Sequence, residues 1–437
     1  MSDAATVGAR PWRRALAWLA FLGPFFFATY GLATWATAQR AGVPSIVFAW
    51  ERWIPFWPWT IVPYWVIDVL YAASLFVCST RRELDTHAKR LLTAQVVAIA
   101  VFLIAPLRFS FVPPPVDGVA GAMFGVLRSF DQPFNQLPSL HLALAVILAA
   151  LFARKTTGIA RVAGVAGFVA IGLSVLTTWQ HHFIDVPTGV LLGALCVWAW
   201  PFESDAVASL WQLTRDPART RLALVYAAGA ALAAVLAVAL GGAALWALWI
   251  AVSLALVAVA YAALGAGAFQ KGHDGRLSLA ARWLYAPYLA GAWVNSRAWT
   301  RRTPDPVAVA DGVFVGRVPT ARELAGSPFA AVVDVTAEFG VDPVGRAYAL
   351  VPMLDLATPT PDELRRAAHA IERLRSDGPL LVCCGLGRSR SACAVAAWLI
   401  STGRVHDAAT AVAVVRARQR EAVLGERHVT ALAGMAA

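Results

Sequence analysis

Charged side chains are scarce in this chain of 437 residues, since Asp, Glu, Lys and Arg make up 14% of it. A soluble protein carries about 25%, so the scarcity excludes an ordinary soluble protein as a description of the whole chain. Hydrophobic residues make up 59%, and the mean hydropathy is +0.61. The net charge of +11 comes from basic clusters between long apolar runs, with no nucleic-acid motif. We therefore expect a membrane protein with basic loops and no nucleic-acid partner.

Cysteine is also scarce, with five residues at irregular spacing. An odd, low count without regular spacing argues against a disulfide framework. Cys78 and Cys196 lie in or beside apolar runs, where a buried thiol is ordinary. We expect neither a metal ion nor a cofactor. The first apolar run has no clear small-residue cleavage site after it, which favours a retained span over a signal peptide.

Several apolar runs approach the length of about 20 residues that a membrane-spanning helix needs. Two are interrupted or short, so six or seven spans remain possible. The candidate spans, eight in all, are 15–36, 55–78, 91–107, 139–154, 159–178, 184–202, 221–241 and 244–266.

The basic residues between these runs predict the orientation. If the spans alternate, all the basic clusters fall on one side, which the positive-inside bias marks as cytoplasmic. We therefore predict a multi-pass protein of the inner (plasma) membrane whose C-terminal part is cytoplasmic. The clusters comprise Arg13, Arg14, Arg81, Arg82, Lys89, Arg90, Arg154, Lys155, Arg161, Arg215, Arg219 and Arg221.

The composition divides the chain into three parts. Residues 1–202 form a helical membrane domain with a six-helix core, and 203–302 add two further spans and a linker. Within the linker, 277–300 reads as an interfacial segment, with a ninth short span or a hairpin as the alternative. From 303 to 437, short β-like runs such as GVFVGRV and LLVCC alternate with helical runs, which predicts a soluble α/β domain.

The stretch LVCCGLGRSRSACAVAAWLI carries the clearest chemistry. A buried strand is followed by a glycine-rich turn and then by a helix, whose N-terminus can hold a phosphate. That environment favours the thiolate form of Cys384, while Arg390 offers two donors to phosphate oxygens. Ser391 could donate to the thiolate or help it leave. The residues expected to cradle the phosphate are Gly385, Leu386, Gly387, Arg388 and Ser389.

A thiolate that accepts a phosphoryl group needs an acid for the leaving oxygen. Asp355 stands after a predicted strand and before a predicted helix, where a movable acid-bearing loop would lie. Asp362 is the alternative, although its position suits a helix cap.

These residues resemble the dual-specificity branch of the protein tyrosine phosphatase superfamily over roughly 304–437. Cys384, Gly387, Arg390 and Ser391 match that family's signature in register. The resemblance implies a phosphoric monoester hydrolase that works through a cysteinyl-phosphate. Cys383 stands where the family usually has His, and it could instead form a reversible disulfide with Cys384.

A second set of polar residues lies at the edges of two predicted spans, in PSLHLALA and WQHHFIDVPTG. His181 and Asp185 are four residues apart, so a helix would place them on one face. His181 could attack a phosphorus atom while His141 protonates the departing oxygen. Ser139 is a candidate phosphate ligand, and His182 is a bystander or a further ligand.

Together these two stretches resemble the type 2 phosphatidic acid phosphatase (PAP2) superfamily, over about 50–200, and most of all its inositol-phosphotransferase-like subgroup. That resemblance implies His181 as nucleophile, His141 as acid, Asp185 as its orienting partner and a site facing outward. Most of the basic residues that neutralise phosphate in that family are missing from this sequence. Arg108 and Arg128 are the candidates here, and Val175 stands where an arginine is usual.

Both sets handle phosphate esters close to lipid headgroups, and bacterial fusions of these two domains are similar to the chain from end to end. We therefore expect a membrane-embedded phosphatase acting on phospholipid-type substrates, with two independent sites. There are two alternatives: a headgroup transferase at the histidine site, and a membrane-anchored protein phosphatase or regulator. The loop's one extra cation, Arg388, favours a monophosphorylated lipid. The oligomeric state cannot be read from the sequence.

Overall fold

The computed structural model describes residues 10–435. The chain forms two compact units, divided between Ala206 and Val207, and each is described here by itself. Residues 207–302 and the C-terminal sheet belong to the second unit.

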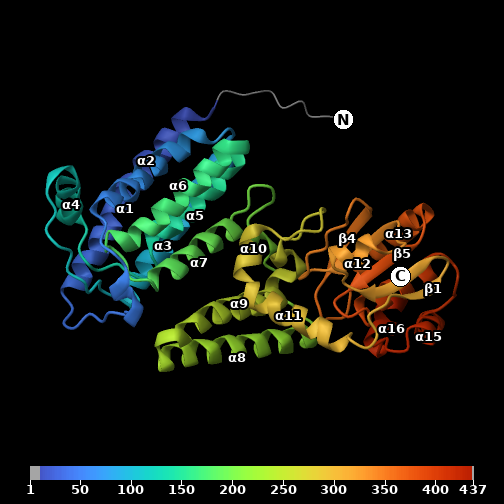
Figure 1. Ribbon diagram of the computed structural model, residues 1–437. Helices are drawn as coiled ribbons and strands as arrows, with labels where there is room; N and C mark the ends of the chain where they lie inside the picture. Colours follow the sequence, from blue (N-terminus) through green and yellow to red (C-terminus); the bar gives the residue numbers. More distant parts are fainter. Residues whose placement is uncertain (1–9, 436–437) are drawn as a thin grey trace. The chain divides into compact units, whose positions relative to one another are not determined.

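Unit 1 is helical (Figure 1), and its helices coincide with the six apolar runs predicted for it. One further helix, α4, lies between α3 and α5, outside the predicted spans. The short 3-10 turns η1 (Ala49–Trp53) and η2 (Pro58–Thr60) precede α2. The helices are α1 (Trp12–Ala38), α2 (Ile61–Val77), α3 (Arg81–Ile104), α4 (Gly118–Phe130), α5 (Leu140–Lys155), α6 (Gly158–Thr177) and α7 (Asp185–Ala199).

Six helical segments in the described part of the chain are long and apolar enough to cross a membrane. Two of the eight predicted spans are shorter, with 16 residues in α5 and 15 in α7. At 1.5 Å per residue such helices reach only about 24 Å, less than the hydrocarbon thickness of roughly 30 Å. The six are Trp12–Ala38, Pro58–Val77, Arg81–Ile104, Gly158–Thr177, Pro217–Leu240 and Gly242–Phe269.

Helices α5 and α7 approach each other closely, and glycine makes this possible. A Cβ at Gly189 would lie 2.5 Å from the carbonyl oxygen of Ser139, and one at Gly193 would lie 2.8 Å from that of Ala143. The two short helices therefore pack backbone against backbone, which brings the start of α7 beside the start of α5.

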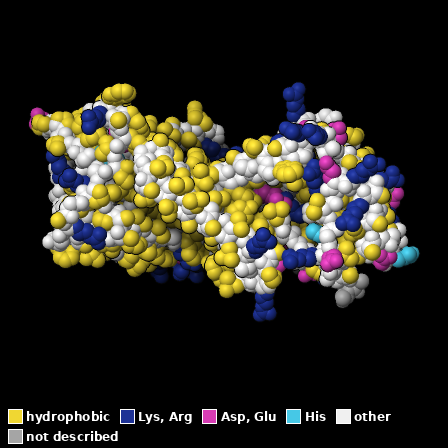
Figure 2. All heavy atoms as spheres, turned by 90° about the horizontal axis from the view of Figure 1, so that it is seen from below, with side chains coloured by type: hydrophobic (Ala, Val, Ile, Leu, Met, Phe, Trp, Pro, Cys, Tyr) yellow, Lys and Arg dark blue, Asp and Glu magenta, His cyan; other side chains and the backbone are white. Residues whose placement is uncertain are grey.

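Unit 2 begins with an apolar helical hairpin. Helices α8 (Pro217–Leu240) and α9 (Ala247–Val259) pack against each other, and η5 (Ala260–Leu264) and η6 (Gly265–Phe269) continue the second arm. Leucine and valine side chains along α8, among them Leu224, Leu232 and Val238, are exposed. Hydrophobic side chains cover this end of the unit in Figure 2, whereas charged side chains gather over its sheet domain. The segment predicted to be interfacial forms two short helices, α10 (Leu279–Leu284) and α11 (Ala286–Trp299).

The rest of unit 2 is a five-stranded sheet covered by helices, as the alternating pattern predicts. The strand order is β1-β2-β5-β3-β4, with β1 antiparallel to β2 and the other pairs parallel. The strands are β1 (Val307–Ala310), β2 (Val313–Arg317), β3 (Ala331–Thr336), β4 (Ala347–Met353) and β5 (Leu380–Cys384). The helices are α12 (Ala321–Ala325), α13 (Pro361–Leu374), α14 (Arg390–Ser401), α15 (Ala408–Arg418) and α16 (Glu426–Ala433).

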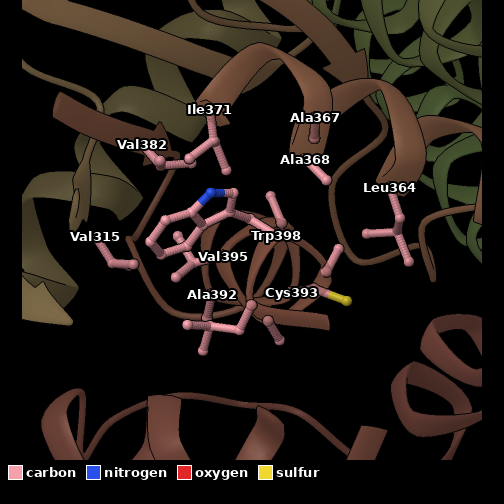
Figure 3. Close-up of a cluster of buried hydrophobic side chains, with 14 of the residues drawn as sticks. Val315, Leu364, Ala367, Ala368, Ile371, Val382, Ala392, Cys393, Val395 and Trp398 are labelled. Carbon is pink, nitrogen blue, oxygen red and sulfur yellow. The ribbon is translucent and has the colours of Figure 1, made fainter. Parts of the chain in front are cut away.

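One face of the sheet carries the main core, around Trp398 of α14. Figure 3 shows this indole among side chains from the sheet and from α13, including Val315, Val382 and Ile371. The Trp398 Nε1 donates to Glu372 at 2.7 Å, which satisfies the buried ring's polar atom. Because α14 packs centrally on β5, its first turn is fixed at the carboxyl end of that strand.

Candidate active sites

The phosphate loop predicted after β5 is a tight turn that leads directly into α14. The Gly387 N–H and the Ser391 hydroxyl each lie 3.2 Å from the Cys384 Sγ, and both donate to it. Gly387 has φ +72°, and a Cβ there would lie 2.5 Å from the carbonyl carbon of Gly316. Only glycine fits this position. The resulting loop directs donors at the sulfur, as a thiolate requires.

Arg390 is buried in the first turn of α14 and pairs with a carboxylate that the sequence analysis missed. Its two terminal nitrogens donate to the two oxygens of Glu338 at 2.8 and 2.7 Å, and one also donates to the Met353 carbonyl at 3.0 Å. The Arg390 Nε has no partner among the described atoms. The guanidinium is thus held rigidly with one donor left for a ligand. The signal for Glu338 was its position just after the buried strand β3, which neighbours β5.

Asp355 lies in the turn after β4, with its Oδ1 2.8 Å from Arg390. Burial raises the pKa of Asp355, and the negative charge of Glu338 raises it further against the pull of Arg390. Glu338 is also buried, yet the charge and hydrogen bonds of Arg390 hold its pKa below the usual value. Two carboxyls whose pKa values are driven apart in this way are typical of an acid and its fixed neighbour. Asp362, the alternative acid, instead bonds Arg365 on the surface of α13.

Two other residues of this segment, Cys383 and Arg388, have partners outside the phosphate loop. Cys383 faces the opposite side of the sheet from Cys384 and packs with Leu324, and burial raises the pKa of Cys383. This placement does not favour a Cys383–Cys384 disulfide. The Arg388 guanidinium donates to Glu421 at 2.6 Å and to a backbone carbonyl of α11. Its charge is therefore neutralised outside the loop.

Both loops of this candidate site are bonded to the part of unit 2 that precedes the sheet. The Tyr261 hydroxyl, in η5 of the apolar hairpin, donates to the Asp355 carbonyl at 2.7 Å. The Ser296 hydroxyl of α11 donates to the Gly385 carbonyl at 2.6 Å. The acid turn and the phosphate loop are therefore each supported from outside the sheet domain.

A buried ion pair joins the same two parts. Lys271, just after the hairpin, lies 2.5 Å from Asp334 of β3, and their side chains are 1% and 0% exposed. Tyr348 donates a further hydrogen bond to Asp334. The pair anchors the hairpin to the carboxyl half of the central strands.

The histidine constellation lies at the adjoining starts of α5 and α7 in unit 1. His181 Nδ1 is 3.2 Å from Asp185 Oδ2, and its Nε2 is 3.1 Å from the Ser139 hydroxyl. Asp185 favours the tautomer with a proton on Nδ1, so that Nε2 accepts from Ser139. His141 lines the same cavity as His181, and its Nε2 has no described partner. The arrangement presents one oriented imidazole and a second one nearby.

The two arginines predicted to neutralise phosphate at this site are placed elsewhere. Arg108 and Arg128 are both exposed, and neither lines the cavity that contains His141 and His181. The Arg128 Nε instead donates to the carbonyl of the preceding helical turn. His182 is held between Glu51 at 2.8 Å and Ser110, which is a structural role.

Comparison with known proteins assigns the C-terminal domain. Residues 313–435 match the family "Dual specificity phosphatase, catalytic domain". No curated protein matches the chain. The domain is therefore a phosphatase of the dual-specificity type and the chain is a phosphoric monoester hydrolase.

Solved structures similar to this chain align with about a third of it. Tk-PTP in its active form is 24% identical with a TM-score of 0.28, over 30% of this chain and 97% of that one. Human DUSP28 is 27% identical with a TM-score of 0.27, over 30% and 94%. PTPMT1 in complex with PI(5)P is 18% identical with a TM-score of 0.27, over 29% and 91%.

Proposed function

We propose that this chain is a membrane-embedded phosphatase that removes phosphate from phospholipid monoesters at Cys384. The observation that carries the proposal is the bond from Tyr261 to the Asp355 turn, because Tyr261 lies in the second half of an apolar segment, Gly242–Phe269, that is long enough to cross a bilayer. A loop bonded near the end of such a segment lies close to the lipid headgroups. A phosphorylated headgroup would reach it without leaving the membrane.

The geometry supports a two-step reaction. The Cys384 thiolate attacks phosphorus, and the sulfur–phosphorus bond forms while the bond to the leaving oxygen breaks. Asp355 gives its proton to that oxygen, and Arg390 binds the phosphoryl oxygens through its unpaired Nε. Water then attacks the cysteinyl-phosphate, Asp355 accepts its proton, and Ser391 stabilises the departing thiolate.

The charge near the loop favours a substrate with one phosphate group. Arg388 is the loop's extra cation, and Glu421 neutralises it. A polyphosphorylated inositol would need more free positive charge than this. A monophosphorylated headgroup, such as that of phosphatidylglycerophosphate, fits better than a polyphosphoinositide.

Phosphate release from vesicles tests this proposal. We expect the purified chain to hydrolyse a phospholipid monoester in a bilayer faster than the matching water-soluble headgroup phosphate. Cys384→Ser should abolish the activity, whereas Cys78→Ser, which changes a buried thiol of unit 1, should leave it intact. Hydrolysis of phosphopeptides without hydrolysis of any lipid would favour the protein-phosphatase alternative.

A second candidate function belongs to the histidine site, and the observation that favours it is His181 held between Asp185 and Ser139. His181 would attack a phosphodiester or monoester, and His141 would protonate the leaving oxygen. Transfer of labelled headgroup to a second alcohol, without free phosphate, would identify a transferase, whereas free phosphate would identify a hydrolase. His181→Ala should remove this activity and leave that of Cys384 unchanged.

The proposed topology places the two centres on opposite sides of the membrane, with the thiol inside the cell. Thiols stay reduced in that compartment. Side-specific labelling of single-cysteine variants at exposed positions near each centre measures this directly. Labelling from a common side would contradict the topology without affecting the chemistry assigned to Cys384.

A further inference from the structure

Unit 1 contains a cavity of about 330 Å³ that His141 and His181 line, and most of its wall takes no part in the chemistry described above. It lies among α1, α2, α4 and α5, and it reaches His181. Two carboxylates line it, Asp68 of α2 and Asp131 at the end of α4. None of the lining residues is Lys or Arg. The cavity is thus acidic where a phosphate site would have to be basic.

The polar atoms that remain unsatisfied around the cavity favour a donor as the ligand. Asn135 is 2% exposed; its Nδ2 donates to Thr34 at 2.6 Å, and its Oδ1 has no partner among the described atoms. Asp131 accepts a hydrogen bond from Tyr30 at 2.7 Å, which leaves its carboxylate with further acceptor capacity. A phosphate would bring further hydrogen-bond acceptors to a wall that already presents acceptors. A positively charged hydrogen-bond donor would instead satisfy the oxygens of Asn135 and Asp131.

The cavity wall also carries aromatic faces suited to a cation. Tyr64 stacks on His141 with ring centroids 4.2 Å apart, and Tyr30, Trp65 and Tyr71 line the same space. Aromatic rings attract a quaternary or primary ammonium group through their negative faces. Acidic and aromatic groups together are the combination that recognises ammonium ions.

The remaining wall is apolar and is contributed largely by α1, including Leu19, Phe26 and Phe27. A hydrocarbon chain attached to the ammonium group would lie against these side chains. Asp68 is the one charged residue of α2, in an otherwise apolar helix. A carboxylate in that setting is costly without a partner of opposite charge.

We propose that this cavity binds the ammonium head of an alkylammonium amphiphile, with Asp68 and Asp131 as the counter-charges. The proposal concerns binding and does not depend on catalysis at His181. It does predict that any lipid handled by His181 carries an amine beside its phosphate. The ammonium could belong to a lipid or to a small free amine, and the length of the alkyl chain distinguishes them.

Calorimetric titration of the full chain in neutral maltoside micelles tests the proposal. We expect octylammonium to bind saturably at one site, and octyl sulfate and octanol to give no saturable heat. Methylammonium should bind at least about tenfold more weakly if the ligand is an amphiphile. Equal binding of the two ammonium probes would assign the site to a free amine and overturn the amphiphile proposal.

Two variants test the residues. Asp131→Asn keeps an acceptor for Tyr30 and should weaken the binding of octylammonium at least about tenfold, as the loss of a buried counter-charge requires. Asp68→Asn provides an independent change on a different helix with the same expectation. Asp117→Asn, a carboxyl of unit 1 outside the cavity lining, is the matched control. Binding unchanged in both cavity variants, or equal binding of octyl sulfate, would overturn the proposal.

Discussion

The hydrogen bond from Tyr261 to the Asp355 carbonyl gives a direct test of whether the apolar hairpin positions the catalytic acid. Tyr261→Phe removes one hydroxyl from a fully buried side chain and leaves the ring packing in place. A neutral hydrogen bond contributes about 1 kcal/mol net, which corresponds to roughly a fivefold change in rate. If this bond holds the Asp355 turn in place, Tyr261→Phe should slow the step in which Asp355 protonates the leaving group.

The assay compares two leaving groups in the full chain. An alkyl phosphate needs its leaving oxygen protonated, so kcat/KM for it should fall about fivefold. A p-nitrophenyl ester leaves with little help from an acid and should lose much less. Tyr285 is another fully buried tyrosine of unit 2, and its ring packs against Phe269. Tyr285→Phe should change the rate for neither ester. An equal loss for both esters, or the same loss in Tyr285→Phe, would refute a positioning role for Tyr261.

Three further predictions concern the site and its supports. Lys271→Met should destabilise unit 2 by about 3–5 kcal/mol in a denaturant titration, because Asp334 is left as an unpaired buried charge; adding Asp334→Asn should restore much of the loss. Gly387→Ala should abolish turnover in a phosphate-release assay, because its Cβ would overlap the backbone of Gly316, while a thermal melt shows the fold retained. Asp355 acts in its protonated form, and its raised pKa keeps it protonated to a higher pH than a free carboxyl. Activity should therefore fall as pH rises through that pKa, and Asp355→Asn should lower kcat about 100-fold and remove this basic limb of the pH profile.

Local signals predicted the phosphate loop well, because the strand, the glycine turn and the helix that form it are contiguous in the chain. The same holds for the contact between His181 and Asp185, which follows from their spacing. Glu338 was missed because its role depends on β3 lying beside β5, and strand order cannot be read from one sequence. Arg108 and Arg128 were proposed as the candidates for the basic residues that the family resemblance implies, and neither lines the cavity that contains His141 and His181.

Segment lengths explain the other differences in the fold. Hydropathy predicted eight apolar helices at the right places, but α5 runs only from Leu140 to Lys155 and α7 only from Asp185 to Ala199. We predicted 203–302 as a separate part because its composition differs from that of the sheet domain. Its contacts with the sheet are made by single polar residues, such as Lys271 and Ser296, and composition does not reveal such contacts.

The buried Lys271–Asp334 pair decides where a soluble fragment of this enzyme can begin. A fragment cut at residue 303, where the sheet domain begins by composition, would leave the Asp334 carboxylate uncovered and the phosphate loop without Ser296. A fragment that starts at Gln270 keeps both and discards the apolar hairpin. Of the supporting hydrogen bonds described above, it loses only the one from Tyr261 to the Asp355 turn. Protein engineering for crystallisation or screening should place the first residue there.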